Sequence, residues 1–273
     1  MRDFRDAKAM AQTLRAELAP KGAVLSHSEC LEITAKIFGA KDWNILSAAI
    51  DRASDSSAVA AVDRWSGPLI LIRDFVLFPK QTAPLFVGRE MSKKALAEAR
   101  RGGFEVLLVA QKEAQEDHPR RDGIYDVGVV ADVLEVADAT ADDLGTKPAE
   151  GTMKLTMRGR QRAKIVAVVD DSGRRHAKAQ LIQSKPEDEA IAAEQVRAAI
   201  EAFKAFAANA QVRGLSADLR SRLMIRAENI TQPGALADLI AQLAPSSVAK
   251  KQSVLETDDE LLRLEAAVAL LKG

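Results

Sequence analysis

The sequence is poor in the features that mark several classes of protein. Its 273 residues include one cysteine, Cys30, so no disulfide can form within the chain and a reducing compartment is expected. Lysine and arginine together number 39, as do aspartate and glutamate, so no net charge attracts nucleic acid. No apolar run approaches the roughly 20 residues that cross a bilayer, and residues 1–10 lack the apolar core of a secretory signal. We therefore expect a cytoplasmic protein without membrane association.

Motifs for catalysis and cofactor binding are also lacking. No GxxxxGK[ST] phosphate loop occurs, and the pair Gly102-Gly103 ends a predicted helix and precedes a strand, the reverse of the order that such a loop needs. His27 and Cys30 have a spacing that could bind metal, yet no second ligand pair follows, and structural zinc takes four ligands. The three histidines lie in separate predicted units, none beside a nucleophile motif: His27, His118 and His176. We expect no cofactor, no metal and no catalytic residue.

Residues 1–52 predict a small unit of three helices. Met10, Leu14 and Leu18 have helical spacing, a second helix begins near Ser26 or Ser28 and ends at Gly39, and Asp42 caps a third. This arrangement looks like a helix-turn-helix, but no cluster of basic residues marks a recognition helix, so DNA binding is disfavoured. Residues 53–66 are small and polar and predict a linker.

Residues 67–184 predict a small, partly open β-barrel with one inserted helix. The helix spans about residues 90–100 and ends at the glycine pair. Seven short segments are typical of strands: 69–72, 83–87, 105–110, 127–136, 153–157, 163–169 and 177–182. Many short strands with a single helix favour a barrel over a doubly wound parallel sheet.

Residues 185–273 predict a helical bundle, which makes the fold class α+β. Val196, Ile200 and Phe203 trace one apolar helix face. Capping-box spacing occurs twice, in Ser184 with Glu187 and in Thr257 with Glu260. Further helices are expected over residues 216–227, 234–243, 248–255 and 258–271.

Two stretches, residues 73–79 (RDFVLFP) and 84–90 (PLFVGRE), resemble the opening of the substrate-binding amino-terminal domain of Lon-type ATP-dependent proteases. The likeness continues in order through residues 107–112 (LLVAQK), 232–238 (QPGALAD) and 251–256 (KQSVLE). It implies a PUA-like barrel followed by a bundle, and a non-catalytic module that recognises unfolded or tagged polypeptides. Such a module is expected to act as an adaptor or regulator of proteolysis or protein quality control, with a full-length Lon-type protease as a candidate partner.

A second resemblance concerns the amino-terminal unit. Residues 26–28 (SHS) and 38–44 (FGAKDWN) are similar to a short helical segment attached to some bacterial glyoxalase-superfamily proteins. The resemblance covers about the first fifty residues. It implies an accessory module and assigns no activity to it.

Polypeptide recognition calls for exposed apolar surface, assisted by unpaired strand edges. The predicted binding residues fall in connections and strand ends near prolines: Phe75, Leu77, Phe78, Leu85 and Phe86. Ordinary core packing is the alternative for all of them. We expect at least one, Phe78, to face solvent.

A second predicted surface is a basic strand face that could hold an anionic ligand. Its members alternate with apolar residues, which places them on one side of a strand: Lys154, Arg158, Arg160, Arg162 and Lys164. Because PUA-like barrels occur in RNA-binding proteins, an RNA-binding module is the alternative function. The neutral net charge and the aromatic content of 4% argue against it. A solvated strand face is the alternative explanation of the pattern.

Overall fold

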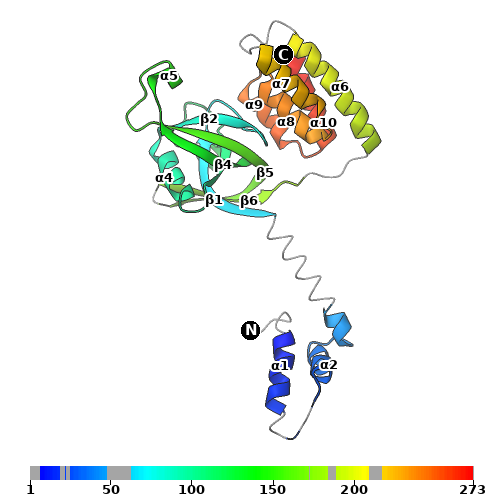
Figure 1. Ribbon diagram of the computed structural model, residues 1–273. Helices are drawn as coiled ribbons and strands as arrows, with labels where there is room; N and C mark the ends of the chain where they lie inside the picture. The colour runs from blue at the N-terminus through cyan, green and yellow to red at the C-terminus, as the bar shows by residue number, and fades with distance from the viewer. Residues whose placement is uncertain are drawn as a thin grey trace. The chain divides into compact units, whose positions relative to one another are not determined.

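A computed structural model describes residues 7–18, 22, 25–47, 63–171, 173–183, 189–208 and 217–272. The chain divides into two compact units, Met1–Val62 and Asp63–Gly273 (Figure 1). The first unit contains α1 (Ala7–Leu18), α2 (His27–Ile37) and a helical turn over residues 43–47, as predicted. The expected linker lies outside the described residues up to position 62.

The start of α2 confirms the cap expected in this unit. The side chain of Ser26 accepts a hydrogen bond from the amide of Glu29, and the Glu29 carboxylate accepts one in return from the amide of Ser26. Beyond the helix, Gly39 adopts the left-handed conformation that lets the chain turn. The helices enclose a small core of Ala7, Ala35 and Leu46.

The second unit begins with a ring of strands. The six strands are β1 (Arg64–Ile72), β2 (Thr82–Val87), β3 (Glu105–Ala110), β4 (Val127–Asp138), β5 (Met153–Asp171) and β6 (Arg174–Leu181). They pair in the order β2-β5-β4-β3-β1-β6, and a further pairing of β5 with β6 closes β1, β3, β4, β5 and β6 into a barrel. The pairing of β1 with β3 is parallel and the others are antiparallel. In the described part of the chain, strand β2 lies outside the ring and pairs with the first part of β5.

Two strands differ from the prediction. Residues 153–171 form one strand, β5, where two had been expected, because the polar middle of the segment is a bulge at Arg160 rather than a turn. Strand β1 begins at Arg64, three residues inside the predicted linker, since Arg64, Trp65 and Ser66 pair with β6. Trp65 packs beside the barrel core, which adds burial to this pairing.

Two glycines allow close approach of backbone segments in the barrel. A Cβ atom on Gly128 would lie 2.3 Å from the carbonyl oxygen of Leu108, and one on Gly159 would lie 2.2 Å from that of Phe78. Gly159 also exchanges backbone hydrogen bonds with Lys80 and Gln81. The chain between β1 and β2 is thereby fixed against β5.

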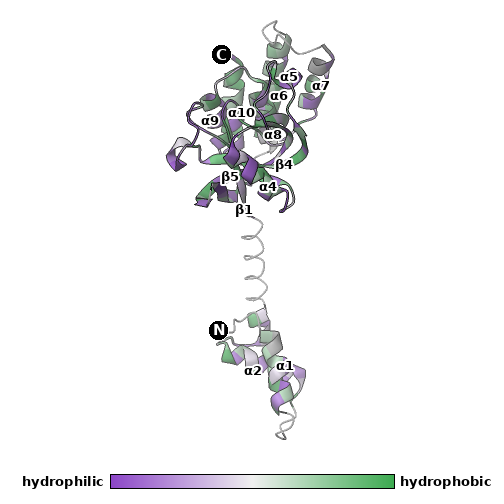
Figure 2. Ribbon diagram, turned by 90° about the vertical axis from the view of Figure 1, so that its left-hand side faces the viewer, coloured by the Kyte–Doolittle hydropathy of each residue, from purple (hydrophilic) through white to green (hydrophobic). Residues whose placement is uncertain are grey.

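Helix α4 (Glu90–Ala99) is the predicted inserted helix and packs against β1, β3 and β6. Two short helices occur in connections, η3 (Arg121–Gly123) and α5 (Ala141–Leu144). Hydrophilic and hydrophobic residues both occur along β5 in Figure 2, as expected for a strand with one covered side. Among the described residues, no helix has the length and apolar character needed to cross a membrane.

The carboxyl-terminal third is the predicted bundle. It contains α6 (Glu189–Ala208), α7 (Ala217–Glu228), α8 (Pro233–Leu243), α9 (Val248–Glu256), α10 (Glu260–Ala269) and η4 (Leu270–Lys272). Helix α8 is buried along most of its length and packs against α6, α9 and α10. The predicted Thr257 cap is wrong, because the side chain of Asp259 caps α10 and Thr257 ends α9. The predicted pair Ser184 and Glu187 lies outside the described residues.

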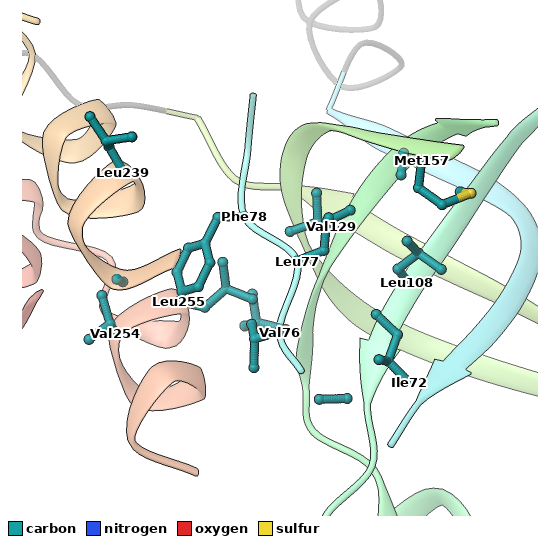
Figure 3. Close-up of a cluster of buried hydrophobic side chains, with 14 of the residues drawn as sticks. Ile72, Val76, Leu77, Phe78, Leu108, Val129, Met157, Leu239, Val254 and Leu255 are labelled. Carbon is teal, nitrogen blue, oxygen red and sulfur yellow. The ribbon is translucent and has the colours of Figure 1, made fainter. Parts of the chain in front are cut away.

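One hydrophobic core joins the barrel to the bundle. Ile72, Leu108 and Met157 fill the barrel side, and Leu239, Val254 and Leu255 come from the helices (Figure 3). In Figure 3 the ring of Phe78 points from the β1–β2 connection toward α8 and α9. Barrel and bundle therefore share their apolar interior, and neither buries its own face alone.

Candidate functional site

The predicted aromatic and aliphatic set is mostly interior. Leu77, Phe78 and Leu85 are buried, while Phe75 and Phe86 are half-buried. The expectation that Phe78 faces solvent is wrong: its exposed fraction is 0%, because the bundle covers the end of the barrel that it occupies. Pro79, which follows it directly, lines this junction, so the neighbouring proline does not mark a free surface.

Exposed apolar side chains gather instead at Phe104 and Leu134, which are 40% and 49% exposed. Both line a surface groove of about 380 Å³ that is also bordered by Arg100, Glu135 and Val136. The groove lies where the connection after α4 meets β4. Large apolar groups exposed together are typical of surfaces that bind other chains.

Backbone irregularities present both side chains to solvent. Phe104 has a φ of 62°, a left-handed conformation that costs a residue with a side chain roughly 1–2 kcal/mol. Leu134 is the extra residue of a bulge, since its neighbours Val133 and Glu135 pair with consecutive residues of β5. The two irregularities are tied together, because the amide of Val133 donates to the carbonyl oxygen of Phe104 over 2.8 Å.

The same region has a free strand edge. The pairing of β4 with β3 ends at Asp132, whereas its pairing with β5 continues to Asp138. In the part of the chain that the structure describes, no strand pairs with residues 135–138 on the side away from β5. A free edge beside an apolar groove is the geometry that an extended peptide can join.

The predicted basic face is largely neutralised by carboxylates. Lys154 pairs with Asp143, Arg158 with Asp132 over 2.9 Å, and Arg160 with Glu105. The hydrogen bond from Lys154, together with those from the amide and hydroxyl of Thr140, lowers the pKa of Asp143 to about 2. Lys164 is exposed on the same strand. Because neighbouring carboxylates compensate the charge of these cations, the surface would attract a phosphate backbone only weakly. It gives the RNA-binding alternative no support.

Arg162 departs from the predicted pattern, because it is buried although its position in β5 matches the exposed bases. Its Nη1 donates to the carbonyl oxygens of Leu255 and Thr257, at 2.9 and 2.8 Å. Burial, with a smaller contribution from the neighbouring charge of Arg263, lowers the pKa of Arg162 to about 10. Arg162 therefore holds the bundle against the barrel.

A second buried charged group lies at the same junction. Asp238 on α8 faces Arg263 on α10, with Oδ1 and Nε 3.9 Å apart, and burial raises the pKa of Asp238 to about 6. Glu260 accepts a hydrogen bond from the amide of Gly234 over 3.1 Å. Three elements thus bring two arginines and two carboxylates to one place beside the apolar core.

No cluster of three or more potential metal ligands occurs among the described residues. Cys30 is buried in the amino-terminal unit, and His27 lies on the exposed first turn of α2.

Comparison with known proteins identifies the barrel and bundle. Residues 67–273 match the family model of the ATP-dependent protease La (LON) substrate-binding domain. The chain belongs to this family. The sequence resemblance is thereby confirmed, and so is the α+β fold that it implied.

Relatives within the Lon substrate-binding-domain family come from several bacteria. The chain is 35% identical over 211 residues to the Lon protease of Escherichia coli, covering 77% of this chain and 25% of that protein. It is 30% identical over 245 residues to the Lon protease of Azorhizobium caulinodans, covering 90% of this chain and 26% of that protein. The chain thus spans about a quarter of the length of the curated relatives it matches.

Solved structures of the same domain share the fold. The N-terminal domain of Mycobacterium avium complex Lon protease superposes with a TM-score of 0.59 at 20% identity, covering 76% of this chain and 98% of that one. A Lon N-terminal domain protein from Xanthomonas campestris gives a TM-score of 0.50 at 18% identity, covering 75% and 98%. Separately, residues 1–70 match the model of a family of glyoxalase superfamily proteins, which confirms the second resemblance.

The sequence pattern did not predict the two exposed apolar members of the groove. The signal for Phe104 was present, because a large aromatic residue directly after Gly102-Gly103 stands in a turn rather than in a strand. Leu134 carried no comparable signal, since a bulge within an apolar strand leaves the alternation of residue types almost unchanged.

Proposed function

We propose that this chain is a polypeptide-recognition module that binds unfolded or tagged polypeptides and catalyses no reaction itself. The observation that carries the proposal is the joint exposure of Phe104 and Leu134 beside a free edge of β4, in a member of the Lon substrate-binding-domain family. Removal of apolar surface from water contributes about 25 cal/mol per Å² to the binding free energy, whatever the amino-acid sequence of the bound polypeptide. Edge pairing adds main-chain hydrogen bonds, which any sequence supplies. Both contributions to the binding energy are suited to polypeptides that share little sequence.

The half-buried residues of the predicted set belong to this proposal as secondary contacts. Phe86 lies on β2, the strand outside the ring, and its backbone partner is Lys154 of β5. Phe75 packs at the border of the shared core. Their exposed portions are smaller than those of Phe104 and Leu134, so we assign them a lesser share of the binding energy.

The test is the affinity for a permanently unfolded protein, reduced and carboxymethylated lactalbumin, measured by fluorescence anisotropy. A double variant, Phe104→Ser with Leu134→Ser, should bind about tenfold more weakly, as expected when two anchors are lost. The matched control exchanges two other exposed apolar residues, Val166→Ser with Leu262→Ser, at positions 71% and 57% exposed. The proposal fails if both double variants bind as the unaltered chain does.

We further propose that the chain acts as an adaptor or regulator of proteolysis, with a full-length Lon-type protease as its partner. The support is its membership of a family whose curated relatives carry this domain on a protease about four times as long. Degradation of the same unfolded protein by the Lon-type protease of the source organism should change when the chain is added. The double groove variant should produce a smaller change, and equal rates with and without the chain would exclude the adaptor role.

A further inference from the structure

The junction between barrel and bundle contains a cavity of about 440 Å³ that is open to solvent on one side and is large enough for a small ligand. Its walls come from the β1–β2 connection, the middle of β5, the end of β6, and helices α7, α8 and α10. It is separate from the groove at Phe104, which no residue of this cavity borders. The proposed polypeptide surface therefore does not account for it.

Positive charge dominates the walls. Lys80 and Arg226 are exposed at the rim, and Arg162 and Arg263 are buried in the wall. Arg160 also borders the cavity, but its guanidinium pairs with Glu105. Asp238 is the carboxylate among the lining residues. Glu260, beside Arg263 at the start of α8, adds a second carboxylate at the same junction. Four cations against two carboxylates still leave an excess positive charge in a partly desolvated space, which favours an anion.

Arg263 has donors that the protein does not use. It is 3% exposed, and its Nε and Nη1 have no hydrogen-bond partner among the described residues. Its Nε lies 3.9 Å from Oδ1 of Asp238, which is beyond hydrogen-bond length and leaves that oxygen unpartnered too. A buried guanidinium with unused donors is costly, so an acceptor in the cavity would be strongly stabilised.

The guanidinium of Arg263 packs closely against Gly234 in the first turn of α8. A Cβ atom on Gly234 would lie 2.2 Å from Nη2 of Arg263 and 2.7 Å from the carboxyl carbon of Glu260. Only glycine in the first turn of α8 permits this approach, and Glu260 fixes the turn by accepting from the amide of Gly234. Arg263 is thus set beside the start of α8, where Glu260 already supplies the negative charge that the helix dipole favours.

We propose that this cavity binds the oxyanion of a small ligand, a carboxylate or a phosphate group, on Arg263 and Arg226. The rest of the ligand would be small and apolar, because Ile182, Ile230 and Leu239 also line the cavity. The occupied site would connect β5 and the β1–β2 connection to the bundle through one bound anion. This binding is independent of the polypeptide surface and goes beyond it.

The test is isothermal titration calorimetry on the full chain at low ionic strength in a phosphate-free buffer. The probes are inorganic phosphate, phenyl phosphate, isocaproate and its neutral amide, isocaproamide. Binding of either phosphate probe, or of isocaproate, without binding of isocaproamide supports the site, and the probe that binds identifies the source of the oxyanion. Absence of binding by all three anions at millimolar concentration overturns the proposal, as does equal binding of isocaproate and isocaproamide.

Substitutions locate the anion. Arg226→Gln, at the exposed rim, should weaken binding by about tenfold or more, the loss expected for a hydrogen bond to a charged group. The matched control is Arg222→Gln, one turn earlier on α7, where the arginine pairs with Asp218 outside the cavity and anion affinity should stay unchanged. Arg263→Gln should abolish binding, and thermal unfolding checks that this variant is folded.

Equal anion affinity in Arg226→Gln and in the unaltered chain would place the anion elsewhere and overturn the assignment. Neither result depends on polypeptide capture. Loss of lactalbumin binding in the Phe104 and Leu134 variant, with anion binding intact, tests the other proposal alone.

Discussion

Arg162 of β5 and Thr257 at the end of α9 are joined by a hydrogen bond of 2.8 Å from guanidinium Nη1 to carbonyl oxygen. The same Nη1 donates to Leu255, 2.9 Å away. Two main-chain carbonyls at a helix end, which lack partners within the helix, are therefore satisfied by a residue 93 and 95 positions away in the sequence. These two hydrogen bonds directly connect the barrel to the bundle beside their shared core.

Arg162→Met should destabilise the fold by about 3 kcal/mol, because it leaves the carbonyl oxygens of buried Leu255 and half-buried Thr257 without this donor while keeping the side-chain stem. Urea unfolding followed by tryptophan fluorescence measures the change. Arg158→Met is the control, since Arg158 is exposed and its pair with Asp132 is worth under about 1 kcal/mol. Equal losses in the two variants would contradict the role given to Arg162.

Gly159→Ala should be destabilised by about 3 kcal/mol or more, because the new Cβ would lie 2.2 Å from the carbonyl oxygen of Phe78. The backbone fixes the position of the Cβ, and the carbonyl oxygen is itself part of the backbone, so neither atom can rotate away. Gly88→Ala is the control: its nearest neighbour would be Thr152 Oγ1 at 3.4 Å, and its backbone is not left-handed. The Gly88 variant should lose less than about 1 kcal/mol in the same unfolding measurement.

The sequence predicted the order of the elements well and their surroundings less well. Helix α4 and the caps at Ser26 and Gly39 could be located because they depend on neighbouring residues. Phe78 was placed on the wrong side because its burial depends on α8 and α9, more than 150 residues further along the chain. Local pattern contains no information about such a partner.

The charged residues show the same limit. Lys154, Arg158 and Arg160 were grouped correctly on one strand, but their carboxylate partners on other elements, among them Glu105 and Asp132, could not be inferred from spacing. The cavity at Arg263 was not predicted at all. It forms where α10 passes the first turn of α8, and only Gly234 within the resembling stretch 232–238 pointed to a close approach there.

Asp238 predicts a pH-dependent stability. Burial raises the pKa of Asp238 from 3.8 to about 6; Arg263 and Arg162 oppose this rise, Glu260 supports it, and Lys80 opposes it weakly. Between these two values the unfolded chain loses a proton that the folded chain keeps. The stability that Asp238 contributes is therefore fully present below about pH 4 and is lost as pH rises through 6. The total loss in the free energy of unfolding is about 3 kcal/mol.

Asp238→Asn removes this titration without a large change of shape. From pH 4 to pH 7, the unfolding free energy of the unaltered chain should fall by about 3 kcal/mol relative to that of the variant. Urea unfolding at several pH values measures it. A constant difference for Asp238→Asn over this range would refute the raised pKa.

Phe104 allows backbone strain and binding to be separated. Phe104→Gly and Phe104→Ala both remove the aromatic ring from the groove, so both should lose the same part of the affinity for unfolded lactalbumin. Their stabilities should differ, because glycine accepts the φ of 62° freely while alanine keeps the left-handed strain. The glycine variant should be more stable than the alanine variant by about 1 kcal/mol. If affinity followed this difference in stability, the ring would not be the binding group, and the strain at Phe104 would have no connection with recognition.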